Sequence, residues 1–214
     1  HPDAGLAFGE WPGREAALVT RLDDGQDHLR CGYVASAHRL ESEGGLARYR
    51  LHCVPWTWML GHARHSRVYQ ERTVRDIVED VLGGHGELAC WRWSEDAMAA
   101  LAEAPARSYC VQYREPDLAF VQRLLAEEGI AGAFESDSGG RLTLVLFSDS
   151  RAQPENPQSA RDGGIRFHRN DGTEAADTLQ QLGARRLLGS NRLSLVTSDY
   201  RGPVLRHVQL PLQA

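Results

Sequence analysis

Residues 108–130 change their hydrophobic period once and carry their own start and stop signals, so they constrain the fold more than any other stretch. Residues 108–113 alternate in polarity and favour β-structure. After them, apolar side chains recur at helical spacing: Leu118, Phe120, Val121, Leu124 and Leu125. The stretch therefore predicts a strand, a tight turn and a helix.

Local signals mark both ends of this predicted helix. Pro116 suits the first helical turn, where its missing N–H costs nothing, and Asp117 places negative charge near the helix N-terminus. Gly129 suits the left-handed position just past the helix, and Ile130 can then fold back onto Leu125.

A second helix is predicted from Thr73 onward. Thr73 is a good N-cap, and Asp76 three residues later completes an approximate capping box. Gly83 and Gly84 end the helix. Its apolar residues form one stripe: Val74, Ile77, Val78, Val81 and Leu82.

The region before this helix predicts antiparallel β-structure. Strands are expected at 16–21, 30–34 and 47–54, separated by turns at 23–25 and 44–45. The third strand alternates apolar and charged residues, as in a sheet with one wet face. Short hairpin strands at this spacing favour a small barrel.

Between and after the two helices the pattern predicts α+β structure. We expect a strand at 88–93, a weak Ala-rich helix at 95–104, and a hairpin formed by 131–134 and 142–147 around a turn at 136–140. The helices are expected to cover one face of a small sheet.

Residues 151–164 are rich in Gln, Pro, Asn, Ser, Asp and Gly, which predicts an exposed linker and the clearest domain boundary. Beyond it, strands are expected at 165–168, 193–197 and 204–210, with a helical or strand piece at 177–182.

Composition excludes several function classes. The net charge is -5, which argues against a general binder of nucleic acid or anionic membranes. All 24 basic residues are Arg, so mechanisms that need a lysine are excluded. No apolar run is long enough to span a membrane, and the N-terminus shows no basic-then-apolar signal pattern. We expect synthesis in a reducing cytoplasm, and the opening at His1 suggests a fragment.

The four cysteines, Cys31, Cys53, Cys90 and Cys110, are widely spaced and contain no Cys-x-x-Cys pair. Each lies among strand-like apolar residues, so buried free thiols are predicted rather than disulfides or a zinc site.

Aromatic and histidine pairs are the first candidates for a binding site. Trp56 and Trp58 could form a stacking platform for a sugar or base, but packing in the protein interior is favoured. His62 and His65 form a His-x-x-His pair without a carboxylate at ligand spacing, so a surface position is favoured over a metal site.

The sequence contains none of the common catalytic motifs. No nucleophile elbow, zinc helix, dinucleotide turn or calcium loop is found. Residues 83–86, Gly-Gly-His-Gly, superficially resemble an oxyanion-hole loop, but they lie where a helix must stop. Glu127 and Glu128 are adjacent on one helix, which favours solvated surface over a glycosidase pair. We therefore predict no enzyme activity, no catalytic, cofactor or metal residues, and no cofactor.

The sequence also resembles a known family. The motif at 109–115 followed by 120–130 is similar to a signature of the VgrG spike proteins of type VI secretion systems. Further similar pieces follow the family's order, at 49–58, 66–70, 74–82 and 149–150. The family is in turn similar to baseplate hub proteins of contractile-tailed phages.

This resemblance implies an α+β, mainly β fold in which two phage-tail-hub-type β-barrels flank a small α+β middle domain. The expected domains are an N-terminally incomplete barrel at 1–65, the middle domain at 66–150, and a second barrel at 151–214.

The implied function is mechanical. Family members form a homotrimer that docks onto the Hcp tube hexamer and contacts baseplate proteins, and the type VI system exports them. We expect no nucleic-acid partner and no stable membrane insertion. The alternative is a carbohydrate-binding or cell-wall-degrading module that uses Trp56, Trp58, Trp91 and Trp93 with scattered carboxylates.

Overall fold

The computed structural model describes residues 5–21, 25–43, 46–152, 167, 179, 181–199 and 202–211. The chain divides into two compact units, His1–Asn156 and Pro157–Ala214. Each unit is described separately below. Within the described residues, no helix is both long and apolar enough to cross a bilayer.

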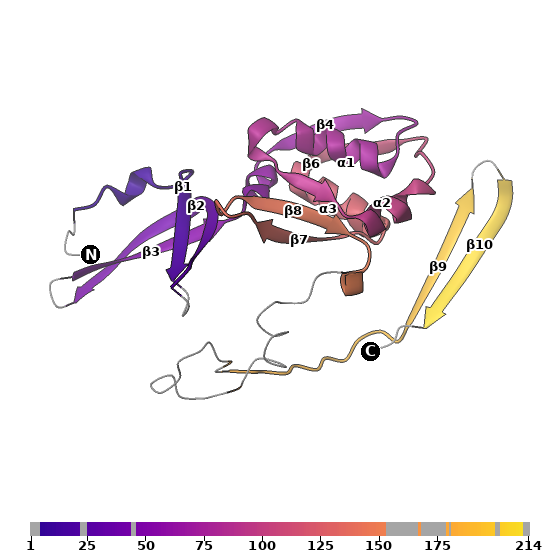
Figure 1. The fold of residues 1–214 in the computed structure, drawn as a ribbon. Helices are drawn as coiled ribbons and strands as arrows, with labels where there is room; N and C mark the ends of the chain where they lie inside the picture. The colour runs from indigo at the N-terminus through magenta and orange to yellow at the C-terminus, as the bar shows by residue number, and fades with distance from the viewer. Residues whose placement is uncertain are drawn as a thin grey trace. The chain divides into compact units, whose positions relative to one another are not determined.

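The first unit opens with a three-stranded antiparallel sheet, β1 (Glu15–Arg21), β2 (Asp27–Glu43) and β3 (Leu46–Val54), in the order β1-β2-β3 (Figure 1). The first part of β2 pairs with β1 up to Tyr33, and the rest pairs with β3. Bulges interrupt the β2–β3 register at two places. The 3-10 helix η1 (Phe8–Glu10) precedes the sheet, and its Phe8 ring lies 6.0 Å from the ring of Tyr49 on β3.

The predicted first barrel is not found as a closed barrel among the described residues. The three strands form an open sheet, whereas even small closed barrels need about five strands. The one-wet-face prediction for β3 is also wrong, because Leu51 on its apolar face is 45% exposed. The predicted turns at 23–25 and 44–45 lie largely outside the described residues.

The rest of the first unit is α+β, as predicted. Its elements in chain order are η2 (Trp56–Gly61), β4 (Arg64–Tyr69), α1 (Val74–Gly83), η3 (Gly86–Leu88), β5 (Trp91–Trp93), α2 (Glu95–Ala102), β6 (Cys110–Pro116), α3 (Asp117–Glu127), β7 (Ala131–Ser136), β8 (Leu142–Phe147) and η4 (Ser150–Ala152).

These strands form two small sheets. Strands β4 and β6 pair antiparallel, and β5, β8 and β7 form a sheet in which β5 runs parallel to β8. Helix α1 packs on α3, and α2 packs on β8 (Figure 1). The strand predicted at 88–93 is shorter, because residues 86–88 form a 3-10 turn.

The core of this unit lies around α1 and α3. The predicted apolar stripe of α1 is buried throughout, and Phe120 and Leu124 of α3 are fully buried against it. The ring of Tyr69 stacks on that of Phe120 with centroids 6.1 Å apart. Burial and the hydrogen bond to Asp80 raise the pKa of Tyr69 to about 12.

The predicted ends of both helices are confirmed. Thr73 and Asp76 form a reciprocal capping box at α1. After α3, Gly129 has φ of 71°, and the N–H of Ile130 donates to the carbonyl of Leu125 at 2.8 Å.

The second unit contains one hairpin among its described residues, β9 (Arg192–Asp199) and β10 (Gly202–Pro211). Both strands were predicted, and the described residues show them paired with each other, without a closed barrel. The only other pairing in its described part is a bridge between Phe167 and Leu179. Residues 153–166, which include most of the predicted linker, lie outside the described residues.

The capping box predicts a measurable stability loss. Replacing Thr73 by Ala removes the side-chain oxygen that accepts from the N–H of Asp76, so the free energy of unfolding should fall by about 1 kcal/mol. Urea unfolding followed by far-UV circular dichroism measures this. Thr73→Ser keeps the oxygen and should be near neutral; equal losses for both variants would contradict the capping role.

Candidate functional site

The most densely connected polar site surrounds the carboxylate of Asp117. Strand β4 contributes His65 and Arg67, β6 contributes Gln112, and the turn after α1 contributes His85. Because side chains alternate along a strand, His65, Arg67 and Gln112 point to the inner face of the β4–β6 pair, where α3 begins. We call these five residues the Asp117 cluster.

Four donors converge on this fully buried carboxylate. Oδ1 accepts from Nδ1 of His65 at 2.8 Å, from Nη1 of Arg67 at 3.0 Å and from Nε2 of Gln112 at 2.6 Å. Oδ2 accepts from Nε2 of His85 at 3.0 Å. Arg67 also donates to Oε1 of Gln112 at 3.0 Å, which fixes the orientation of that amide.

The cluster keeps Asp117 ionised. Burial by itself would raise the pKa of its carboxyl group, but hydrogen bonds from Gln112, His65 and His85 and the charge of Arg67 outweigh burial and hold that pKa below its usual value. Oδ1 accepts three of these hydrogen bonds and Oδ2 accepts one. The arrangement suits a structural cross-link, because the carboxylate is fully buried and joins side chains from β4, β6 and the turn after α1.

The sequence pattern does not predict this cluster. It predicts a surface position for His65 and a turn at residues 83–86, with no contact between them. His65 is half exposed but bonded to Asp117, and the turn is real but directs His85 inward. One sequence signal points toward the cluster: His65 and Arg67 alternate along β4 in register with the buried Tyr69, so the three residues share one face of the strand.

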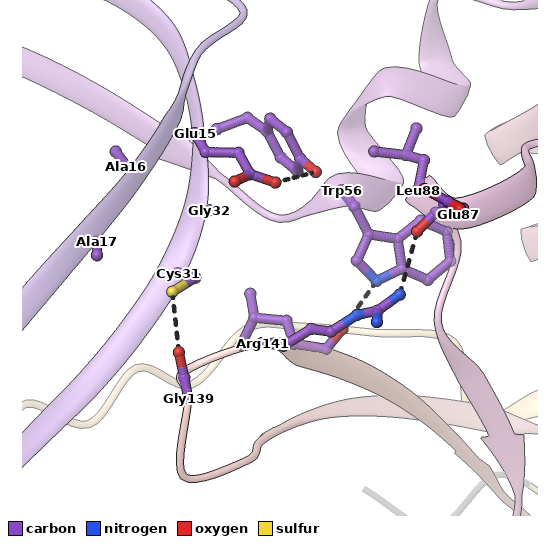
Figure 2. Close-up of a pocket in the computed structure, with 12 residues that line it drawn as sticks. Glu15, Ala16, Ala17, Cys31, Gly32, Trp56, Glu87, Leu88, Gly139 and Arg141 are labelled. Atoms are coloured by element: carbon purple, nitrogen blue, oxygen red, sulfur yellow. Dashed lines mark hydrogen bonds between the residues drawn. The ribbon is translucent and has the colours of Figure 1, made fainter.

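A second candidate is a pocket of about 990 Å³. Figure 2 shows its walls, which come from β1 and β2, from η2 and η3, and from the turn between β7 and β8. Trp56 forms an apolar wall, and Glu15, Glu87 and Arg141 carry the charges.

The polar groups of this pocket are bonded to one another. The hydroxyl of Tyr33 donates to Glu15 at 3.1 Å, Arg141 donates to the carbonyl of Glu87 at 3.1 Å, and Nε1 of Trp56 donates to the carbonyl of Leu142 at 3.2 Å. These bonds hold the walls together (Figure 2). None of these three bonds joins a cysteine, serine or threonine side chain to a histidine.

The pocket also marks where the β1–β2–β3 sheet joins the α+β part. The backbone N–H of Cys31 donates to the carbonyl of Gly140 at 2.9 Å. Gly140 has φ of 80°, and a Cβ there would lie 2.9 Å from Cβ of Leu29. A glycine is therefore needed at this contact.

The predicted tryptophan site does not form a platform. Trp56 is 3% exposed and belongs to the core, as the packing interpretation predicted. Trp58 is half-buried, with its ring 4.2 Å from that of His62. Trp91 and Trp93 are also half-buried, and Nε1 of Trp93 donates to Glu79 at 3.0 Å.

Two other sequence predictions need correction. Glu127 and Glu128 are not simply solvated, because Arg107 donates to both carboxylates. All four cysteines are free thiols, as predicted, but only Cys110 is buried, and Cys53 is exposed. Among the residues that the structure describes, no group of three His, Cys, Asp or Glu side chains could hold a metal ion.

Comparison with known proteins places these features in context. A family model described as "Phage tail baseplate hub (GPD)" matches residues 1–211. The type VI secretion system spike protein VgrG1b of Pseudomonas aeruginosa is 33% identical over 145 residues, which cover 68% of this chain and 18% of that protein. VgrG4b of the same organism is 40% identical over 124 residues, 58% of this chain and 15% of that protein.

A solved structure is similar as well. The E. coli c3393 protein is described as a type VI secretion component with structural similarity to the T4 bacteriophage tail proteins gp27 and gp5. It matches with a TM-score of 0.60 and 25% identity, over 72% of this chain and 41% of that one. The match with this chain thus spans only 15–18% of the length of the two Pseudomonas aeruginosa relatives.

The Asp117 cluster predicts that replacing one carboxylate oxygen of Asp117 by an amide nitrogen strongly lowers the stability of the fold. Asp117→Asn removes the charge that faces Arg67 and places an amide N–H₂ against other donors, so the free energy of unfolding should fall by about 3 kcal/mol or more. Urea unfolding at pH 7 measures it. Asp27→Asn, which breaks the exposed pair with Arg21, is the matched control and should cost much less; a loss as small for Asp117→Asn would refute the cluster's role.

A pH dependence follows from the same carboxylate. Because the pKa of Asp117 is lower in the folded chain than in the unfolded chain, its contribution to stability is present above the unfolded pKa of about 4 and is lost as pH falls through the folded value. Unfolding free energies from pH 6 downward should therefore fall more steeply for the wild type than for Asp117→Asn. Parallel curves would contradict this assignment.

Proposed function

Because the chain belongs to the phage tail baseplate hub family, we propose that it is a structural, non-enzymatic part of the hub of a type VI secretion spike. The observation that carries this proposal is the family match, which runs along residues 1–211. The similarity to the E. coli structure supports the same role.

In the detailed form of the proposal, the intact protein is a trimer that docks onto an Hcp-type tube and contacts baseplate proteins. Its parts are a first barrel at 1–65, a middle domain at 66–150 and a second barrel at 151–214. Three copies with two related barrels would offer six similar surfaces to a hexameric tube. Export by the type VI system belongs to the same proposal.

Exposed apolar faces support assembly with other chains. In the β9–β10 hairpin, Leu195 pairs with Val208 and Leu193 pairs with Leu210, so the four side chains share one face. All four are 40–52% exposed. An isolated two-stranded hairpin is marginally stable in water, so this face is expected to be covered in the working protein.

The sheet β1–β2–β3 also exposes apolar side chains. Leu18 and Val19 of β1 are 61% and 53% exposed, and Leu46 of β3 is 52% exposed. Additional strands or a neighbouring subunit would bury these side chains. Each of the two β-regions is thus suited to be completed by assembly.

The hairpin face gives a direct test of the assembly role. Leu195→Asp/Val208→Asp places charges on a face that is already exposed in the separate chain, so its folding should change little, while burial in the assembly should be blocked. With the substitutions in the chromosomal gene, release of the tube protein into the medium should be lost.

The matched control is Ser194→Asp/Gln209→Asp, which adds the same charges to the opposite face of the same hairpin. It should leave release much less affected. Normal release from the Leu195→Asp/Val208→Asp strain would overturn the proposed burial of this face. Circular dichroism of both purified variants checks that the fold is retained.

A further inference from the structure

The two-stranded sheet of β4 and β6, which we call the β4–β6 ribbon, has two very different faces. Its inner face carries the Asp117 cluster together with the buried Tyr69 and Cys110. Its outer face carries Val68 and Tyr113, which are 55% and 69% exposed, and Tyr109, which directly precedes β6, is 59% exposed. Tyrosine is enriched among the residues that contribute most to protein–protein binding.

Two arginines lie at the same end of the ribbon. Nη1 of Arg64 donates to the backbone carbonyl of Arg114 at 3.0 Å, and the guanidinium of Arg114 lies 5.5 Å from the ring centroid of Tyr113. Neither arginine pairs with a carboxylate in the described part of the chain. This end of the ribbon is therefore locally basic, although the whole chain has a net charge of -5.

The ribbon also offers an unpaired strand edge. Among the described residues, β4 pairs with β6 alone, so its second edge has no strand partner. Figure 1 shows β4 at the outer margin of the first unit. A six-residue edge of this kind presents backbone N–H and C=O groups that can pair with another chain.

A second copy of the chain is a poor partner for this edge. Strand β4 contains no acidic residue, so a second β4 strand would offer no carboxylate to Arg64. An acidic segment has the opposite effect, because its carboxylates would meet the two arginines that lack such partners.

We propose that the β4–β6 ribbon binds an extended acidic segment of a partner polypeptide, which adds as a strand to the free edge of β4. Side chains of that segment on the outer face pack against Val68 and Tyr113, and its carboxylates face Arg64 and Arg114. This site is separate from the hairpin face of β9–β10.

The inner face prepares this surface for binding. The Asp117 cluster fixes β4 and β6 through His65, Arg67 and Gln112, so the ribbon does not have to order itself when the partner arrives. Preorganisation of this kind reduces the entropic cost of association.

The test uses the full chain and two fluorescent peptides of about eight residues, long enough for one strand. One alternates Glu and Val, and the other alternates Lys and Val. Fluorescence anisotropy at low salt should show that the Glu–Val peptide binds at least about tenfold more tightly. Arg64→Glu/Arg114→Glu should reverse this preference.

Two controls complete the test. Arg30→Glu/Arg50→Glu makes the same charge change on exposed positions of β2 and β3 and should keep the preference for the acidic peptide. Methylation of alternate backbone nitrogens along one edge of the Glu–Val peptide should abolish binding, while methylation along the other edge should not. No preference for the acidic peptide, no reversal in Arg64→Glu/Arg114→Glu, or indifference to methylation on both edges would overturn the proposal.

Discussion

The carboxylate of Asp117 is the interaction on which the α+β part of the structure depends. Its backbone N–H donates to the carbonyl of Ala63 at 2.8 Å, and its side chain accepts from β4, β6 and the turn after α1. A buried charge that lost one of these partners would cost several kcal/mol. The positive end of the α3 dipole adds to the same balance, because Asp117 is the first residue of that helix. The relative positions of four segments therefore follow from one side chain.

The Asp117 cluster lies in the part of the chain that buries its apolar side chains, whereas the two β-regions leave many of theirs exposed. Around α1 and α3 the apolar side chains are buried and the buried polar groups of the described residues are all bonded. In β1–β2–β3 and in β9–β10, comparable aliphatic side chains remain exposed. The physical difference is the presence or absence of a covering layer, since a sheet buries its apolar face only against another element. Within the described residues, a well-covered α+β part is thus joined to a sheet that lacks such a cover.

The sequence predicted those elements whose local and tertiary signals agree. The stripe of α1, the capping box at Thr73 and the left-handed Gly129 each follow from short-range rules that the core then reinforces. Strand β2 runs nine residues beyond its predicted end at Val34, because residues 38–41 lie exposed on the sheet and need no apolar alternation. Asp117 was read by its local role at a helix N-terminus, whereas its partners come from positions 65, 67, 85 and 112. Contacts between residues so far apart in the chain leave no periodic pattern in the sequence.

The contacts to Asp117 also explain why the two faces of the β4–β6 ribbon differ. Alternation along β4 and β6 sends one set of side chains to a saturated polar cluster and the other set to solvent. The hydrogen bonds among Arg67, Gln112 and Asp117 link β4 and β6 on the face opposite Val68 and Tyr113. In the hairpin β9–β10, by contrast, the apolar face has no covering element among the described residues. The described residues therefore present two kinds of surface, one on a cross-linked ribbon and one on an uncovered hairpin.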